Sequence, residues 1–282
     1  MQCAWDAYLK ILPEQIRADV DKLGKHTLQE LRLRINCPVE LILSTGSSVL
    51  SHITTGKDIL YCINAATGYS PWAAETMVNG YITAPGGHRI GVCGTAISEK
   101  GFITGVRDPT MLCIRVARDF PDIAKGFAIH GKSVLVIGPP GCGKTTFLRD
   151  MIRRYSNECD RSICVIDERG ELFPFIKETC CYPIGKRTDV LSGYGKKDGI
   201  QIALRCMGPG AIAVDEITVA EDCVSLHEAG WCGVNLFATA HAASRADLFT
   251  RAIYKPLLES KLFDTLIILH KNKTWVAERM NI

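Results

Sequence analysis

The sequence predicts an α/β protein in which a helix-covered parallel sheet follows a smaller N-terminal α+β domain. Two observations support this prediction. From about residue 133 onwards, short apolar strands alternate with helical segments, as in parallel sheets that are buried on both faces. Before about residue 120, apolar and polar residues alternate over stretches that indicate antiparallel strands. We therefore expect an N-terminal domain over residues 1–120, a linker over 121–132 and a core over 133–282.

The N-terminal domain should combine helices and strands. Apolar residues at helical spacing predict two helices that meet at Gly24, and Gly86-Gly87 predicts a turn before a long strand. In chain order, we expect helical segments within 13–36, strands at 39–46 and 47–54, helices at 57–68 and 71–84, and strands at 86–106 and 111–118.

The core should begin with a strand that leads directly into a glycine-rich turn. Each later strand is short, apolar and followed by a helix or a long loop, which favours βα units. We expect strands at 133–137, 162–166, 211–215 and 234–240, helices at 144–155, 196–207 and 219–229, and a closing hairpin within 263–280.

The composition excludes several classes of protein. The chain has 282 residues, of which 47% are hydrophobic and 22% charged, with a net charge of only +3, which gives little support to nucleic-acid binding. The sequence contains no apolar run near the ~18 residues of a membrane span, and its first residues lack the apolar stretch of a signal peptide. The thirteen cysteines form no Cys-x-x-Cys pair. We expect a cytoplasmic protein with reduced thiols.

The turn after the first core strand has the spacing of a phosphate-binding loop. Gly138, Gly143, Lys144 and Thr145 fit the Walker A pattern G-x-x-x-x-G-K-[ST]. Glycines let successive N–H groups point at an anion, Lys144 would reach the β- and γ-phosphates, and Thr145 would bind Mg²⁺. The expected nucleotide-binding residues are Gly138, Pro139, Pro140, Gly141, Cys142, Gly143, Lys144, Thr145 and Thr146.

Acidic pairs end two of the later core strands. Asp215-Glu216 and Asp167-Glu168 both follow apolar strands, and strand ends of this kind face the ligand crevice of a parallel sheet. Asp215 would hold Mg²⁺, with Asp167 as a further metal contact, and either Glu216 or Glu168 would orient the attacking water. His241 follows another strand and is a candidate sensor of the γ-phosphate.

Taken together, five motifs resemble one family. "GGHRIGVCG", "IGPPGCGKTTFLRD", "VIDERGEL", "AVDEITVAED" and "ATAHA" are similar to the stage III sporulation protein AA family of spore-forming bacteria, which is related to the hexameric ATPases of type II and type IV secretion. The resemblance implies a P-loop NTPase core of the RecA-like, additional-strand type. By position it makes Asp167 and Glu168 the Asp box, Asp215 and Glu216 the Walker B segment, and His241 the His box.

The resemblance also implies arginines that approach the nucleotide from the N-terminal strands. Arg89 and Arg115 are the candidates in the catalytic set, and Arg107 is a further counterpart; Arg187 and Arg205 carry the same ambiguity. A guanidinium can pair in two places with the charge that develops on the γ-phosphate.

For function, the resemblance implies a Mg-dependent, hexameric ATPase in the mother cell. It would bind ATP and ADP and energise a membrane complex between mother cell and forespore, which it reaches through protein partners rather than a membrane span.

Three other functions remain open from the residues. ATP could order a binding surface with little or no hydrolysis, so that the chain is a nucleotide-gated assembly module. The ATPase could be stimulated by nucleic acid, although the small net charge argues against this. A metabolite kinase is the third alternative, and the acidic second strand and the large N-terminal domain make it less favoured.

Overall fold

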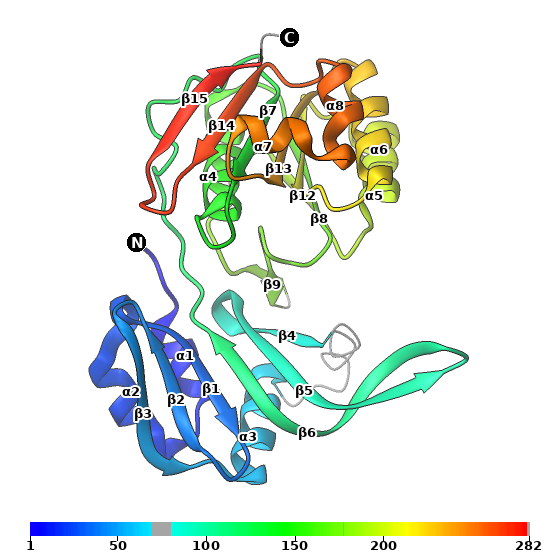
Figure 1. Ribbon diagram of the computed structural model, residues 1–282. Helices are drawn as coiled ribbons and strands as arrows, with labels where there is room; N and C mark the ends of the chain where they lie inside the picture. The colour runs from blue at the N-terminus through cyan, green and yellow to red at the C-terminus, as the bar shows by residue number, and fades with distance from the viewer. Residues whose placement is uncertain (69–79, 177, 281–282) are drawn as a thin grey trace. The chain divides into compact units, whose positions relative to one another are not determined.

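The computed structural model describes residues 1–68, 80–176 and 178–280 (Figure 1). The chain forms two compact units. The first comprises Met1–Asp119 together with Phe175–Tyr182, and the second comprises Phe120–Pro174 and Pro183–Ile282.

The first unit is built on a six-stranded antiparallel sheet with the order β3-β2-β1-β6-β5-β4. β5 and β6 extend beyond their neighbours as a two-stranded ribbon (Figure 1). The strands are β1 (Leu28–Arg34), β2 (Pro38–Leu43), β3 (Gly46–Ile53), β4 (Tyr81–Ala84), β5 (His88–Glu99) and β6 (Phe102–Arg115). A separate short hairpin pairs β9 (Phe175–Ile176) with β10 (Thr179–Cys180).

Three helices bury one face of this sheet: α1 (Trp5–Ile11), α2 (Glu14–Thr27) and α3 (Gly56–Thr67). Their apolar side chains, such as Tyr8 and Ile59, share one core with the strand residues Leu31 and Ile114. Helix α3 has defined ends, because Thr55 and Asp58 form a capping box and Gly68 takes the left-handed conformation after the last turn.

Two expected helices of this unit differ from the structure. Gly24 breaks α2 as predicted, with φ 72°, but the residues after α2 form strand β1. Leu31 and Leu33 alternate there with half-buried arginines, and pairing with β2 and β6 decides between helix and strand. The helix expected over 71–84 lies largely outside the described residues, and its last part is β4.

The second unit is built on a seven-stranded sheet with the order β11-β8-β12-β13-β7-β14-β15. All neighbouring strands are parallel except the final antiparallel pair, β14 and β15. The strands are β7 (Val134–Gly138), β8 (Ile163–Asp167), β11 (Thr188–Ser192), β12 (Ala211–Glu216), β13 (Asn235–His241), β14 (Thr265–Leu269) and β15 (Trp275–Arg279).

Helices cover both faces of the parallel sheet, as its continuous apolar strands predict. Helix α4 (Lys144–Glu158) packs on one face, where the rings of Tyr155 and Phe237 meet at 5.4 Å. The other helices lie on the opposite face (Figure 1). Their apolar side chains share a core with strand residues such as Ile137 and Val214. These helices are α5 (Lys196–Ile202), which continues as a π-helical turn (Ala203–Met207), α6 (Ala220–Trp231), α7 (Arg245–Thr250) and α8 (Lys255–Glu259).

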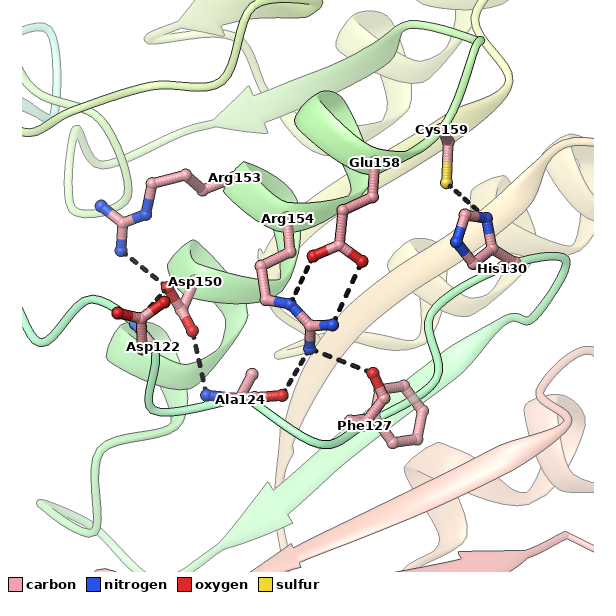
Figure 2. Close-up of polar contacts among 9 residues, drawn as sticks. All are labelled: Asp122, Ala124, Phe127, His130, Asp150, Arg153, Arg154, Glu158 and Cys159. Carbon is pink, nitrogen blue, oxygen red and sulfur yellow. Dashed lines mark hydrogen bonds and ion pairs between the residues drawn. The ribbon is translucent and has the colours of Figure 1, made fainter.

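The expected linker, residues 121–132, is hydrogen-bonded to α4 within the second unit (Figure 2). The buried Asp150 carboxylate accepts the N–H groups of Asp122 and Ala124 at 3.0 and 2.9 Å. One turn further along α4, Arg154 donates to the carbonyl oxygens of Ala124 and Phe127. This stretch therefore belongs to the same body as the helix that begins at Lys144.

Candidate functional site

The segment between β7 and α4 has a backbone that can surround an anion. Gly141 (φ 73°) and Gly143 (φ 105°) take left-handed angles, which residues with a Cβ rarely adopt. Gly138 has no room for a side chain, because a Cβ there would lie 2.7 Å from Leu269 O. The first N–H groups of α4, from Lys144 onwards, lack partners within the helix and carry the positive end of its dipole. Glycine geometry and helix dipole together favour a bound phosphate group.

Lys144 connects this loop to the neighbouring strand. Its buried ammonium donates to Gly138 O and lies 3.0 Å from His241 Nδ1. Because an ammonium can only donate, Nδ1 accepts and the ring proton of His241 resides on Nε2. Burial lowers the pKa of Lys144, and the charges of Cys142, Glu216 and Asp215 oppose this effect.

Glu216 continues the same row of side chains. His241 Nε2 lies 2.5 Å from Glu216 Oε1, at ion-pair distance but not in a hydrogen-bonding direction. Among the described residues, none donates a hydrogen bond to this buried oxygen. The His241 ring is therefore the polar group beside this oxygen.

Asp215 lies beside Glu216 at the carboxyl end of β12 and is buried. The pKa of Asp215 is raised to about 6, first by burial and then by the charges of Asp167 and Glu216, while Lys196 and Arg169 act in the opposite direction. Such a concentration of carboxylate oxygens suits a hard divalent cation. Mg²⁺ would be held by Asp215 and Thr145 together with phosphate oxygens and water.

Asp167 has a different arrangement from the expected metal contact. Its Oδ1 accepts the N–H of Glu171, and its Oδ2 accepts those of Leu172 and Phe173, at 2.8 to 3.1 Å. Arg149 of α4 donates to carbonyl oxygens of the same loop, at Leu172 and Glu171. These hydrogen bonds favour a role for Asp167 in holding the loop after β8, rather than in binding metal.

Glu168, the rival candidate for the base, is held by a lysine that no sequence motif marks. Its Oε2 lies 2.7 Å from Lys196 Nζ, and Asp222 Oδ2 lies 3.6 Å from the same nitrogen. Lys196 is buried, whereas the Glu168 side chain is 42% exposed. The glycines around Lys196 in "SGYGKKDG" are the one signal that could have drawn attention to it.

The expected arginines lie in four different places. Arg89 and Arg115 are register partners on β5 and β6 of the first unit, where Arg115 pairs with Glu30 and Arg89 lies over the Tyr81 ring. Their roles at the nucleotide stay predictions. Arg107 is exposed on the β5–β6 ribbon, and Arg205 is exposed on the π-helical turn. Arg187 donates to the carbonyl oxygens of Ser156 and Cys159, at the end of α4 remote from Lys144.

Comparison with known proteins decides the family. The family model described as "Sporulation stage III, protein AA" matches residues 5–277. The chain belongs to this family. Stage III sporulation protein AA of Bacillus subtilis (strain 168) is 34% identical over 277 residues, which cover 94% of this chain and 90% of that protein.

Solved structures share the fold at low sequence identity. The ATPase DotB of Legionella pneumophila has a TM-score of 0.58 and 16% identity, over 94% of this chain and 79% of that one. The pilus retraction motor PilT with bound ADP has a TM-score of 0.63 and 17% identity, over 90% of this chain and 76% of that one. The expected α/β fold with a parallel sheet is confirmed, and DotB and PilT share it.

Two kinds of feature are absent from the described residues. No helix within residues 1–68, 80–176 and 178–280 has the length and apolar character needed to cross a bilayer. Over the same residues, no three or more His, Cys, Asp or Glu side chains are arranged to hold a metal ion. A Mg²⁺ ion that arrives with a nucleotide needs only one or two carboxylates, so the pair of Asp215 and Thr145 remains compatible with it.

Proposed function

We propose that the chain binds Mg·ATP at the β7–α4 loop and hydrolyses it. The observation that supports this best is the contiguous row of Lys144, His241 and Glu216, which joins the glycine-rich β7–α4 loop to the carboxylate at the end of β12. Family membership and the shared fold with DotB and PilT agree with the proposal.

Each side chain has a distinct task in this proposal. Lys144 and the N–H groups of the loop bind the β- and γ-phosphates. Mg²⁺, when bound by Thr145 and Asp215, neutralises charge on the phosphate oxygens. Glu216 accepts a hydrogen bond from the attacking water and orients it, while His241, which contacts both Lys144 and Glu216, can respond to the γ-phosphate through Lys144.

Phosphate release with saturating Mg·ATP tests the proposal. We expect Lys144→Ala to lower turnover by about 100-fold or more, because it removes a preorganised cation from the developing charge. Lys197→Ala, which removes an exposed lysine, is the matched control and should retain turnover. Folded wild-type protein that takes up no adenine nucleotide in calorimetry would refute the proposal.

Two amide variants decide which carboxylate orients the water. Glu216→Gln should bind ATP and fail to release phosphate, since a neutral amide cannot accept the proton. The same result with Glu168→Gln, and not with Glu216→Gln, would transfer the role to Glu168. If both variants behave as wild type and wild type shows tight ATP binding without turnover, the chain is a nucleotide-gated binding module instead.

We further propose that the chain works as a hexameric motor of a membrane complex between mother cell and forespore, which it reaches through protein partners. Membership of the sporulation family and the fold shared with a pilus retraction motor support this role. Native mass with and without ATP, on the sample assayed for phosphate release, tests assembly. Arg89→Ala and Arg115→Ala should lower turnover of the assembled form more than Arg32→Ala, a control on the same sheet.

A further inference from the structure

Lys196 is a buried lysine near the nucleotide site that the motifs of the sequence do not include. Only 6% of its side chain is exposed. Its Nζ lies 2.7 Å from Glu168 Oε2, in the loop after β8, and 3.6 Å from Asp222 Oδ2, in the first turn of α6. Asp222 is itself fixed, because its Oδ2 accepts the N–H groups of Thr218 and Val219. The Lys196 ammonium thus lies between the fixed Asp222 carboxylate and the Glu168 carboxylate, and it pairs with both.

The contacts of β11 and α5 with β8 place Lys196 at this position. The N–H of Gly193 donates to Asp167 O at 3.1 Å, which ties the end of β11 to the end of β8. Lys196 then begins α5, and Gly199 on that helix packs so closely on β8 that a Cβ would lie 2.7 Å from Ile166 Cγ2. A glycine at 199 therefore lets the helix approach the strand whose end carries Glu168.

Stability alone gives a poor account of a lysine at this place. Burying an ammonium costs free energy that its ion pairs repay only in part, and an apolar side chain of similar volume is often as stabilising. A half-exposed glutamate without such a partner would sample several rotamers. The ion pair therefore provides orientation, which a reaction needs, more than it provides stability.

We propose that Lys196 is a positioning residue of the nucleotide site, whose ammonium holds the Glu168 carboxylate in one orientation at the carboxyl end of β8. This inference rests on the proposed hydrolysis of ATP, to which Glu168 contributes either as the base or as a second carboxylate. Lys196 touches no reacting atom in this scheme and acts through Glu168.

A set of five variants tests the inference in the full chain. Lys196→Met removes the charge at similar length, Lys196→Arg keeps it, Glu168→Gln removes its partner, Lys196→Met/Glu168→Gln removes both, and Lys197→Met changes the exposed neighbouring lysine as a matched control. For each variant, kcat and KM for ATP, the affinity for Mg·ADP and the thermal midpoint are measured.

We expect Lys196→Met to lower kcat by about 10- to 100-fold, as a misplaced reacting group does, while KM and the ADP affinity change by less than about threefold. Lys196→Arg should recover part of kcat, and Lys197→Met should match wild type. The double variant should have a kcat no lower than that of Glu168→Gln, since both substitutions act on the same Glu168 carboxylate. A purely structural lysine would instead lower the thermal midpoint and leave kcat per folded molecule unchanged.

Three outcomes would overturn the inference: Lys196→Met as active as Lys197→Met, losses that multiply in the double variant, or Glu168→Gln with wild-type kcat. If Lys196→Met does not fold, the double variant, which leaves no unpaired ammonium, is compared with Glu168→Gln, and equal kcat values support the inference. Wild-type protein without turnover refutes the proposed hydrolysis, and this inference with it. Wild-type turnover with an unaffected Lys196→Met refutes the inference alone.

Discussion

Acidification from pH 7.5 to pH 5 should destabilise the first unit through His88. The imidazole is fully buried. Its Nε2 bonds with Ala4 O at 3.0 Å, and its Nδ1 accepts the N–H of Ala117 at 3.0 Å. Only the neutral ring fits both partners, because a protonated Nδ1 would face another donor. The pKa of His88 is lowered to about 4, chiefly by burial and also by the charge of Arg118, while the hydrogen bond to Ala4 acts in the opposite direction.

The size of the effect follows from this pKa. In the unfolded chain the ring has its ordinary pKa of 6.5, so between pH 6.5 and 4 the unfolded state binds a proton that the folded state does not. The contribution of His88 to stability is complete above pH 6.5 and is lost as the pH falls through 4. At 1.36 kcal/mol per pKa unit, the full loss is about 3 kcal/mol, and about 2 kcal/mol of it occurs by pH 5.

Two measurements check this prediction. An NMR titration of histidine labelled at Cε1, with His88→Gln to identify the resonance, should give a pKa near 4 for His88. Hydrogen exchange of amides in β5 and β6, corrected for intrinsic rates, should report a fall in local opening free energy of about 2 kcal/mol from pH 7.5 to pH 5. Strands β7 and β13 of the second unit serve as the internal reference.

The variant also separates His88 from the other titrating groups. His88→Gln should be less stable than wild type at pH 7.5, and the difference should shrink by about 2 kcal/mol at pH 5, where wild type has lost its advantage. A His88 resonance that titrates near 6.5, or a stability difference that is the same at both pH values, would refute the reasoning.

Three further substitutions have outcomes that the structure sets. Asp150→Ala should lower the free energy of unfolding by about 3–5 kcal/mol in urea titration, because the N–H groups of Asp122 and Ala124 lose their acceptor and the buried Arg153 loses an ion-pair partner at 3.1 Å. Gly138→Ala should abolish ADP binding in calorimetry, since its Cβ would lie 2.7 Å from Leu269 O and force the loop to move. Asp167→Asn should lower the free energy of unfolding by about 2–3 kcal/mol in thermal melts, because the amide NH₂ of asparagine would face N–H donors. In the same variant, an unchanged dependence of ADP affinity on Mg²⁺ would confirm that Asp167 does not bind the metal.

Several parts of the fold and site follow from local sequence pattern. Buried parallel strands are apolar along their whole length, so β7, β8, β12, β13 and β14 stand out against the amphipathic helices between them. The glycine-rich loop between β7 and α4 is equally predictable, because the left-handed angles at Gly141 and Gly143 need glycine. The row of Lys144, His241 and Glu216 could be expected from strand ends that meet at one edge of a parallel sheet.

Other parts depend on contacts between residues distant in sequence. Residues 28–34 have leucines that fit a helix or a strand, and only pairing with β2 and β6 makes them β1. Asp167 looks like a metal ligand by its place at a strand end, yet the loop after it folds back and occupies both carboxylate oxygens.

By itself, the sequence determined the class of the core, the glycine-rich loop after its first strand and the carboxylates at its strand ends, because glycine angles and strand periodicity are properties of a few neighbouring residues. Tertiary structure alone decided that Lys196 meets Glu168 and Asp222, that residues 121–132 lie along α4, and that His88 is held neutral. The physical reason is that burial, ion pairing and pKa depend on which distant segments the fold brings within a few ångströms, and no local pattern encodes those distances.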